Sequence, residues 1–182
     1  MFSAGENSKN FPQKTQIAAD FLIQLPNKKM KKIYYLFAIL LIAIILIQFF
    51  PAKLPENTQG ISQEGTAVQN ANNEVMAILK TSCYDCHSNQ TNYRWYSYVA
   101  PVSWQIAKDV LEGREALNFS EWNTLNQRKM VSKLADIKEV LAKDVMPMKI
   151  YTFIHSDAKL NPTQKLLITD WIDLETKRIL GE

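Results

Sequence analysis

Two cysteines and a histidine stand together near the middle of this chain of 182 residues. The stretch reads Cys83-Tyr84-Asp85-Cys86-His87, and it holds the only two cysteines in the sequence. C-x-x-C-H is the attachment signature of a c-type haem, whose two vinyl groups form thioethers with the thiols. The histidine that follows directly can bind the iron from one face. The motif therefore predicts one covalent haem c, attached to Cys83 and Cys86, with His87 as an iron ligand.

A cysteine pair at this spacing has other uses, and each was weighed. It could form a structural disulfide or a thioredoxin-like redox pair, but the latter expects a βαβ setting and the flanking sequence here is helical. A zinc site could combine both cysteines with His87 and His155, although the adjacent Cys86 and His87 strain tetrahedral geometry. We favour haem because an export signal precedes the motif.

That signal is an apolar run of 18 residues over 33–50, interrupted only by Gln48. At about 1.5 Å per residue, such a helix just crosses a hydrocarbon core of about 30 Å. A cleaved signal peptide is the rival interpretation, but the run is long for one and residues 49–53 make a poor cleavage site. The sequence predicts a single uncleaved transmembrane helix.

Four lysines, at positions 28, 29, 31 and 32, directly precede the run. Because positive residues stay on the cytoplasmic side, residues 1–32 are expected to be a basic cytoplasmic tail. Met30 is an alternative start, in which case residues 1–29 precede the protein. Everything after Phe50 is then exported, which predicts a bacterial inner-membrane protein whose haem domain faces the periplasm.

The exported part divides by composition. Residues 51–73 are rich in Asn, Gln, Pro and Gly, which is typical of a flexible linker. Residues 74–182 have the size of one small domain. With 15 basic and 16 acidic residues, the region 51–182 is nearly neutral, so no nucleic-acid partner is expected.

Apolar residues recur at helical spacing through this domain, and no strand pattern competes. The sequence predicts an all-α fold, with a helix leading into Cys83, one over 101–112 stopped by Gly113, one opened by Ser120 as N-cap, and one from Pro162 to Leu180.

The second axial ligand decides what such a haem can do. The candidates are Met146, Met148 and His155. Methionine opposite histidine raises the reduction potential and suits electron transfer, whereas an open position admits small ligands. Met146 is preferred because it precedes Pro147 in an irregular segment between two predicted helices.

Several residues between the motif and position 114 could surround the porphyrin. Trp95 and Trp104 are candidates for the pocket wall, although core packing explains such residues as well. Arg94 and Arg114 could pair with the haem propionates or lie in solvent.

The chain resembles a family of small bacterial haem-binding domain proteins, single-haem relatives of cytochrome c with an N-terminal membrane anchor. The resemblance extends from about Glu74 to Trp171 and is carried by residues 83–89, 95–97, 100–104, 113–115, 117–122 and 146–147. It implies a cytochrome c-like helical fold and supports Met146, which stands at the family's Met-Pro position.

Three functions were compared. The preferred one is a membrane-anchored electron carrier with redox partner proteins and no enzymatic activity. A haem-based sensor or ligand-binding module with an open or displaceable sixth site is the alternative. A small peroxidase would need a distal acid or base, for which His155 is the histidine left.

Overall fold

The structure is a computed structural model, and it describes residues 28–58 and 70–181. Within these ranges every regular element is helical and no strand is present, so the predicted all-α fold is confirmed. The chain divides into two units, residues 1–46 and residues 47–182, which are described separately.

The first unit contains helix α2 (Lys28–Ile47). Its segment Met30–Ile47 has a mean hydropathy of 2.2 and buries none of its residues, so it is long and apolar enough to cross a membrane. The helix ends three residues before the predicted end at Phe50. Gln48, which already belongs to the second unit, bonds through its side-chain amide to the backbone of Ala100 in the same unit.

Asparagine side chains start three of the helices that form the core of the second unit. Helix α4 (Asn73–Ser82) is capped by Asn72, α7 (Gln127–Ala142) by Asn126, and α9 (Pro162–Leu180) by Asn161. Such a cap is worth about 1 kcal/mol, because it satisfies backbone N–H groups that the helix leaves free. The predicted helix from Pro162 to Leu180 is confirmed.

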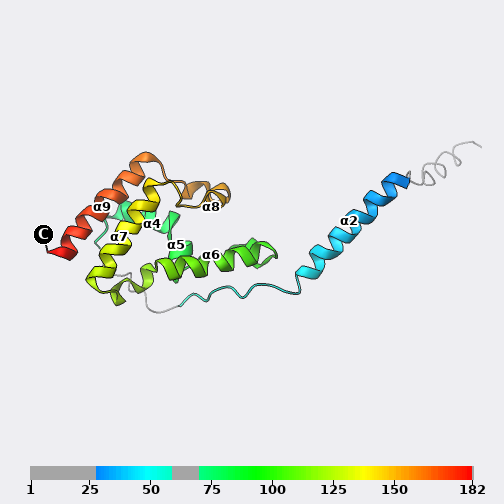
Figure 1. Ribbon diagram of the computed structural model, residues 1–182, viewed down its shortest axis with the longest axis horizontal. Helices are drawn as coiled ribbons and strands as arrows, with labels where there is room; N and C mark the ends of the chain where they lie inside the picture. Colours follow the sequence, from blue (N-terminus) through cyan, green and yellow to red (C-terminus); the bar gives the residue numbers. More distant parts are fainter. Residues whose placement is uncertain (1–27, 59–69, 182) are drawn as a thin grey trace, which may run out of the picture. The chain divides into compact units, whose positions relative to one another are not determined.

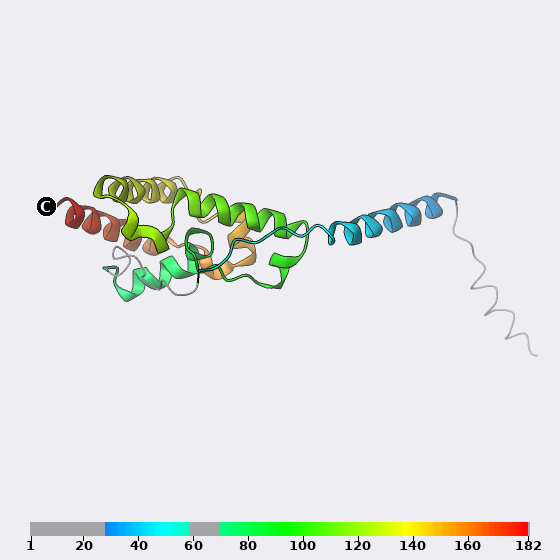
Figure 2. The ribbon, with the colours of Figure 1, turned by 90° about the horizontal axis from the view of Figure 1, so that it is seen from below.

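Apolar faces hold these helices together. In both views α7 lies alongside α9, and α4 contacts α9 (Figures 1 and 2). Their contact buries Leu79, Leu134 and Ile168 completely. Full burial of each such side chain contributes about 1.5–3 kcal/mol. The short 3₁₀ helix η2 (Phe119–Thr124) adds two buried aromatic rings to this core.

The C-x-x-C-H motif comprises Cys83, which precedes α5, and α5 itself (Tyr84–His87), which packs against α6 (Val102–Ala116). Gly113 was predicted to stop this helix, and that prediction is wrong, since α6 continues for three residues beyond it. Glycine is needed there for close packing rather than for termination. A Cβ on Gly113 would lie 2.5 Å from the carbonyl oxygen of Cys86.

Three short elements complete the unit: η1 (Trp95–Tyr98), α8 (Lys149–Ile154) and η3 (Ser156–Ala158). Ser120 was expected to cap a helix, and this is also wrong. Its hydroxyl accepts a hydrogen bond from the Asn89 backbone, and Asn118 caps η2 instead. Helix α8 was not predicted from the sequence.

Residues 48–57, which we call the strap, form hydrogen bonds with other residues of the second unit. The Asn57 side-chain amide bonds both backbone groups of Thr91, at 2.7 and 3.0 Å, and the Tyr93 hydroxyl donates to the Pro55 carbonyl. A flexible linker was predicted over 51–73. Its first part is held by these bonds, residues 59–69 lie outside the described residues, and flexibility there stays a prediction.

Candidate functional site

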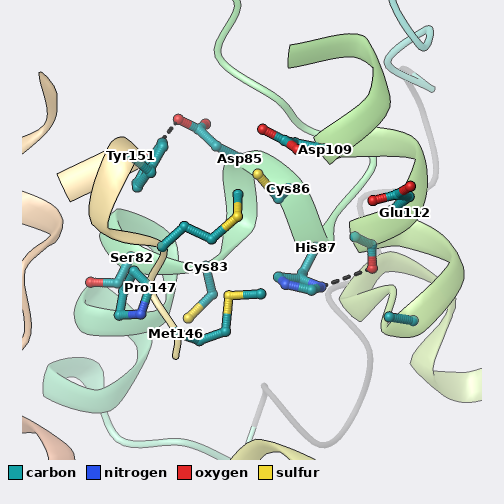
Figure 3. Close-up of a pocket in the computed structure, with 13 residues that line it drawn as sticks. Ser82, Cys83, Asp85, Cys86, His87, Asp109, Glu112, Met146, Pro147 and Tyr151 are labelled. Carbon is teal, nitrogen blue, oxygen red and sulfur yellow. Dashed lines mark hydrogen bonds between the residues drawn. The ribbon is translucent and has the colours of Figure 1, made fainter. Parts of the chain in front are cut away.

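Two adjoining cavities, of about 230 and 220 Å³, lie beside the C-x-x-C-H motif. Figure 3 shows the first of them, with Cys83, Cys86, His87 and Met146 around one space. The residues lining both cavities are Ser82, Cys83, His87, Ala116, Met146 and Pro147. The second cavity is walled mainly by apolar side chains of the core, including Leu79, Phe119, Ile137, Val140 and Leu141.

The backbone at the end of α6 fixes the ring of His87. Its Nδ1 lies 2.8 Å from the carbonyl oxygen of Gly113 and 3.1 Å from that of Leu117. Both neighbours are acceptors, so Nδ1 carries the proton and Nε2 keeps its lone pair. Burial also lowers the pKa of His87, which keeps the ring neutral. A neutral imidazole with a free Nε2 is the form that binds iron.

The two cysteines are free thiols in this structure. Burial, together with the neighbouring Cys86, raises the pKa of Cys83 to about 12. Burial and the carboxylates of Asp109 and Asp85 raise the pKa of Cys86 to about 11. A thioredoxin-like pair requires a lowered thiol pKa, so these surroundings argue against a redox role.

A zinc site receives no support either. In the ranges 28–58 and 70–181, no three side chains of His, Cys, Asp or Glu are grouped as metal ligands. His155, the fourth ligand of the zinc alternative, lines neither of the two cavities beside Cys83.

Met146 and Met148 both line the first cavity, but only Met146 also lines the second. In Figure 3 the side chain of Met146 points toward the ring of His87. The segment between α7 and α8 supplies both methionines. Of the three candidate sixth ligands, Met146 is therefore the one placed opposite the histidine.

His155 lies in a different environment. Its Nε2 is 2.7 Å from the hydroxyl of Tyr96, and its Nδ1 is 3.1 Å from the backbone oxygen of Tyr151. The side chain is buried beside a third cavity of about 120 Å³. With both nitrogens engaged there, His155 is not brought to the motif.

The structure does not bring Trp95, Trp104 or Arg94 to the two cavities. Trp95 is 78% exposed, and the indole N–H of Trp104 donates to the Phe50 carbonyl at 2.8 Å. Arg94 lines a separate polar hollow. Arg114 bonds Ser88, Glu56, Asn57 and Thr91, so it joins the strap to the loop after the motif.

Two residues of the site were missed in the sequence. Lys133, on α7, is the one Lys or Arg among the described residues lining the two cavities, and no periodicity singles it out. The carbonyl of Leu117 was also missed, because a backbone acceptor leaves no mark on residue type. Together with the thiols, His87 and Met146, these groups fit a haem: an apolar wall, two attachment points, two axial ligands and one cation for a propionate.

Comparison with known proteins gives one match. A family model described as a haem-binding domain matches residues 42–174. No curated protein and no solved structure matches the chain.

Proposed function

Because this chain belongs to the haem-binding domain family, we propose that it is a membrane-anchored c-type cytochrome that transfers electrons through one covalent haem. Cys83 and Cys86 would hold the haem through thioethers, and His87 and Met146 would bind its iron. The observation that carries the proposal is the meeting of two protonated thiols, an imidazole with a free Nε2 and a thioether around one space. When bound, the haem supplies a one-electron couple at its iron.

The residues around the cavity set the properties of that couple. The carbonyls of Gly113 and Leu117 hold His87 in the ligating tautomer and make it a better donor. A thioether opposite histidine raises the reduction potential. The apolar side chains of the second cavity would keep water from a bound haem, and Lys133, which lines the same cavity, would pair with a propionate.

The location follows from the first unit. Lys31 and Lys32 lie at the start of the candidate span Met30–Ile47, and no charged residue follows them within it. Their position supports an inner-membrane anchor with the haem domain on the periplasmic side of a bacterium. No enzymatic activity is proposed, since His155 is bonded through both nitrogens away from the haem cavities.

A sensor or ligand-binding module with a displaceable sixth ligand is the second candidate. One observation favours it: α8, which begins three residues after Met146, has no buried residue. A methionine on a weakly packed segment can leave the iron at little cost, and a small ligand can then take its place.

The full chain, produced in a host that attaches haem to exported proteins, tests the proposal. Four forms are compared in detergent: the natural sequence, Cys83→Ala with Cys86→Ala, Met146→Ala, and Met148→Ala as the matched control. Haem is stained on a denaturing gel, and oxidised and reduced spectra are recorded with and without carbon monoxide.

We expect haem on the gel for every form except the double cysteine variant. The methionine-to-iron charge-transfer band should disappear in Met146→Ala, with a lower potential, and persist in Met148→Ala. An unstained natural protein would refute covalent attachment. A band that survives in Met146→Ala would assign the ligand elsewhere, and carbon monoxide binding to the native reduced protein would favour the sensor.

A further inference from the structure

The second unit carries an exposed group of aromatic and apolar side chains around the start of α6. Trp95 is 78% exposed, Tyr98 62% and Trp104 42%, and Phe49 and Phe50 are also largely exposed. We call this group, with Val99, the aromatic surface. Soluble proteins rarely gather so many large apolar side chains in one patch, so such a patch marks an interaction site.

Hydrogen bonds within this unit join the patch to the first residues after the candidate span Met30–Ile47. Gln48 donates to the carbonyl of Ala100 and accepts from its N–H, both at 3.0 Å. The Trp104 indole donates to the carbonyl of Phe50. A chain leaving a bilayer after Ile47 has Gln48 and Phe50 at the lipid–water boundary, and these bonds hold the loop around Ala100 at the same level.

The chemistry of the patch fits that boundary. Tryptophan and tyrosine are enriched where a protein meets the headgroups, because an apolar ring and a polar N–H or O–H are satisfied there together. The exposed cations Lys53 and Arg94 neighbour the patch in sequence and can meet lipid phosphates. The patch therefore combines the residue types that anchor proteins in the headgroup region.

We propose that the aromatic surface rests in the headgroup layer of the leaflet from which Gln48 emerges. The inference depends on the proposed membrane span, but it does not depend on the haem. The strap extends this attachment as far as Asn57 and Thr91, next to the haem motif. The haem cavity is thus held near the membrane surface, where a partner must approach it, and does not swing on a long tether.

Site-specific photo-cross-linking of the full chain tests the proposal. The photoreactive residue p-benzoylphenylalanine replaces Trp95 or Tyr98. The matched control replaces Arg128, which is exposed on the first turn of α7, at the other end of the unit from the start of α6 (Figures 1 and 2). A positive control replaces Leu40 within the span. Each protein is placed in nanodiscs of phosphatidylcholine and phosphatidylglycerol, irradiated and weighed by mass spectrometry.

We expect lipid adducts at positions 95 and 98 to exceed those at position 128 by about tenfold. Lipid adducts at position 40 without any excess at 95 and 98 would overturn the docking but leave the membrane anchor standing. Absence of lipid adducts at position 40 as well would remove the span and the docking together. Cross-links from 95 or 98 to a second copy of the chain would replace the bilayer with a dimer interface. Native absorption spectra show separately whether each variant is folded around haem.

Discussion

The two sides of the haem cavity are built differently. On the side of His87, the imidazole is bonded to two backbone carbonyls of α6 and its C-terminal end, and Arg114 of the same helix bonds the loop after the motif and the strap. On the side of Met146, the methionine lies in a segment whose neighbour α8 buries no residue. One side-chain bond, from Tyr151 to Asp85 at 2.8 Å, ties α8 to the motif.

The difference separates two tasks. In the proposed cytochrome, attachment and ligation by His87 would depend on backbone geometry that few substitutions can alter. Ligation by Met146 would depend on side chains in a lightly packed segment, where small changes suffice to alter ligand access or potential. A carrier and a sensor could therefore share the His87 side and differ only on the side of Met146.

The sharpest test of the rigid side is Gly113→Ala. The added Cβ would lie 2.5 Å from the Cys86 carbonyl oxygen and 3.0 Å from its Cβ, so α6 must move away from α5. We expect a loss of about 3 kcal/mol in unfolding free energy, with less haem-bound protein recovered. The measurement is denaturant unfolding of the full chain in detergent, together with haem staining.

Gly181→Ala is its matched control. Gly181 has φ +77° but no atom within 4 Å of an added Cβ, so only backbone strain of about 1 kcal/mol is expected. Equal effects of the two substitutions would show that α6 and α5 do not pack as closely as the structure has them.

A smaller effect is expected from Arg114→Ala. The guanidinium donates four hydrogen bonds, two to the backbone oxygens of Ser88 and Glu56 and two to side chains. Because the Arg114 side chain is partly exposed, losing these bonds should lower the unfolding free energy by only about 2 kcal/mol. Arg128→Ala, in an exposed position, should change stability by less than about 0.5 kcal/mol. Thermal unfolding, monitored by circular dichroism, compares the two variants. Indistinguishable midpoints would mean that the bonds from Arg114 to the strap contribute nothing to the stability of the fold.

The smallest effect is expected on the other side of the cavity, from Tyr151→Phe. Burial and the neighbouring Asp85 raise the pKa of Tyr151 well above its usual range, so the hydroxyl remains a donor as pH rises. Removing this hydroxyl should lower the unfolding free energy by about 1 kcal/mol and weaken the attachment of α8 to the motif. The methionine-to-iron band should then fade at a lower temperature than in Tyr98→Phe, whose ring is exposed. A band as heat-stable as in that control would argue that Met146 is held by other contacts.

Much of this molecule could be predicted where a local pattern carries the information. Asn161 and Pro162 mark the start of α9 because capping is decided within one turn of helix. The C-x-x-C-H spacing predicts a haem for the same reason, since all its groups lie within five residues, and the family match supports haem binding.

The predictions failed where the decisive partner is distant in sequence. Gly113 resembles a helix stop until the Cys86 carbonyl is placed against it. The strap has the composition of a linker, but Asn57 and Gln48 find backbone partners 34 and 52 residues away. Lys133 is an ordinary helical lysine until α7 borders the cavity. None of these contacts leaves a periodic mark in the sequence.

The close approach at Gly113 also imposes an order of events during maturation. Once α6 lies against α5, no room is left for even a methyl group between Gly113 and the backbone of Cys86, and both cysteines are only partly exposed. An attachment enzyme must reach both sulfurs, so we expect it to act on the exported chain before α6 closes. Gly113 is 27 residues downstream of Cys86, so in the proposed topology the motif would leave the membrane before the helix that packs against it.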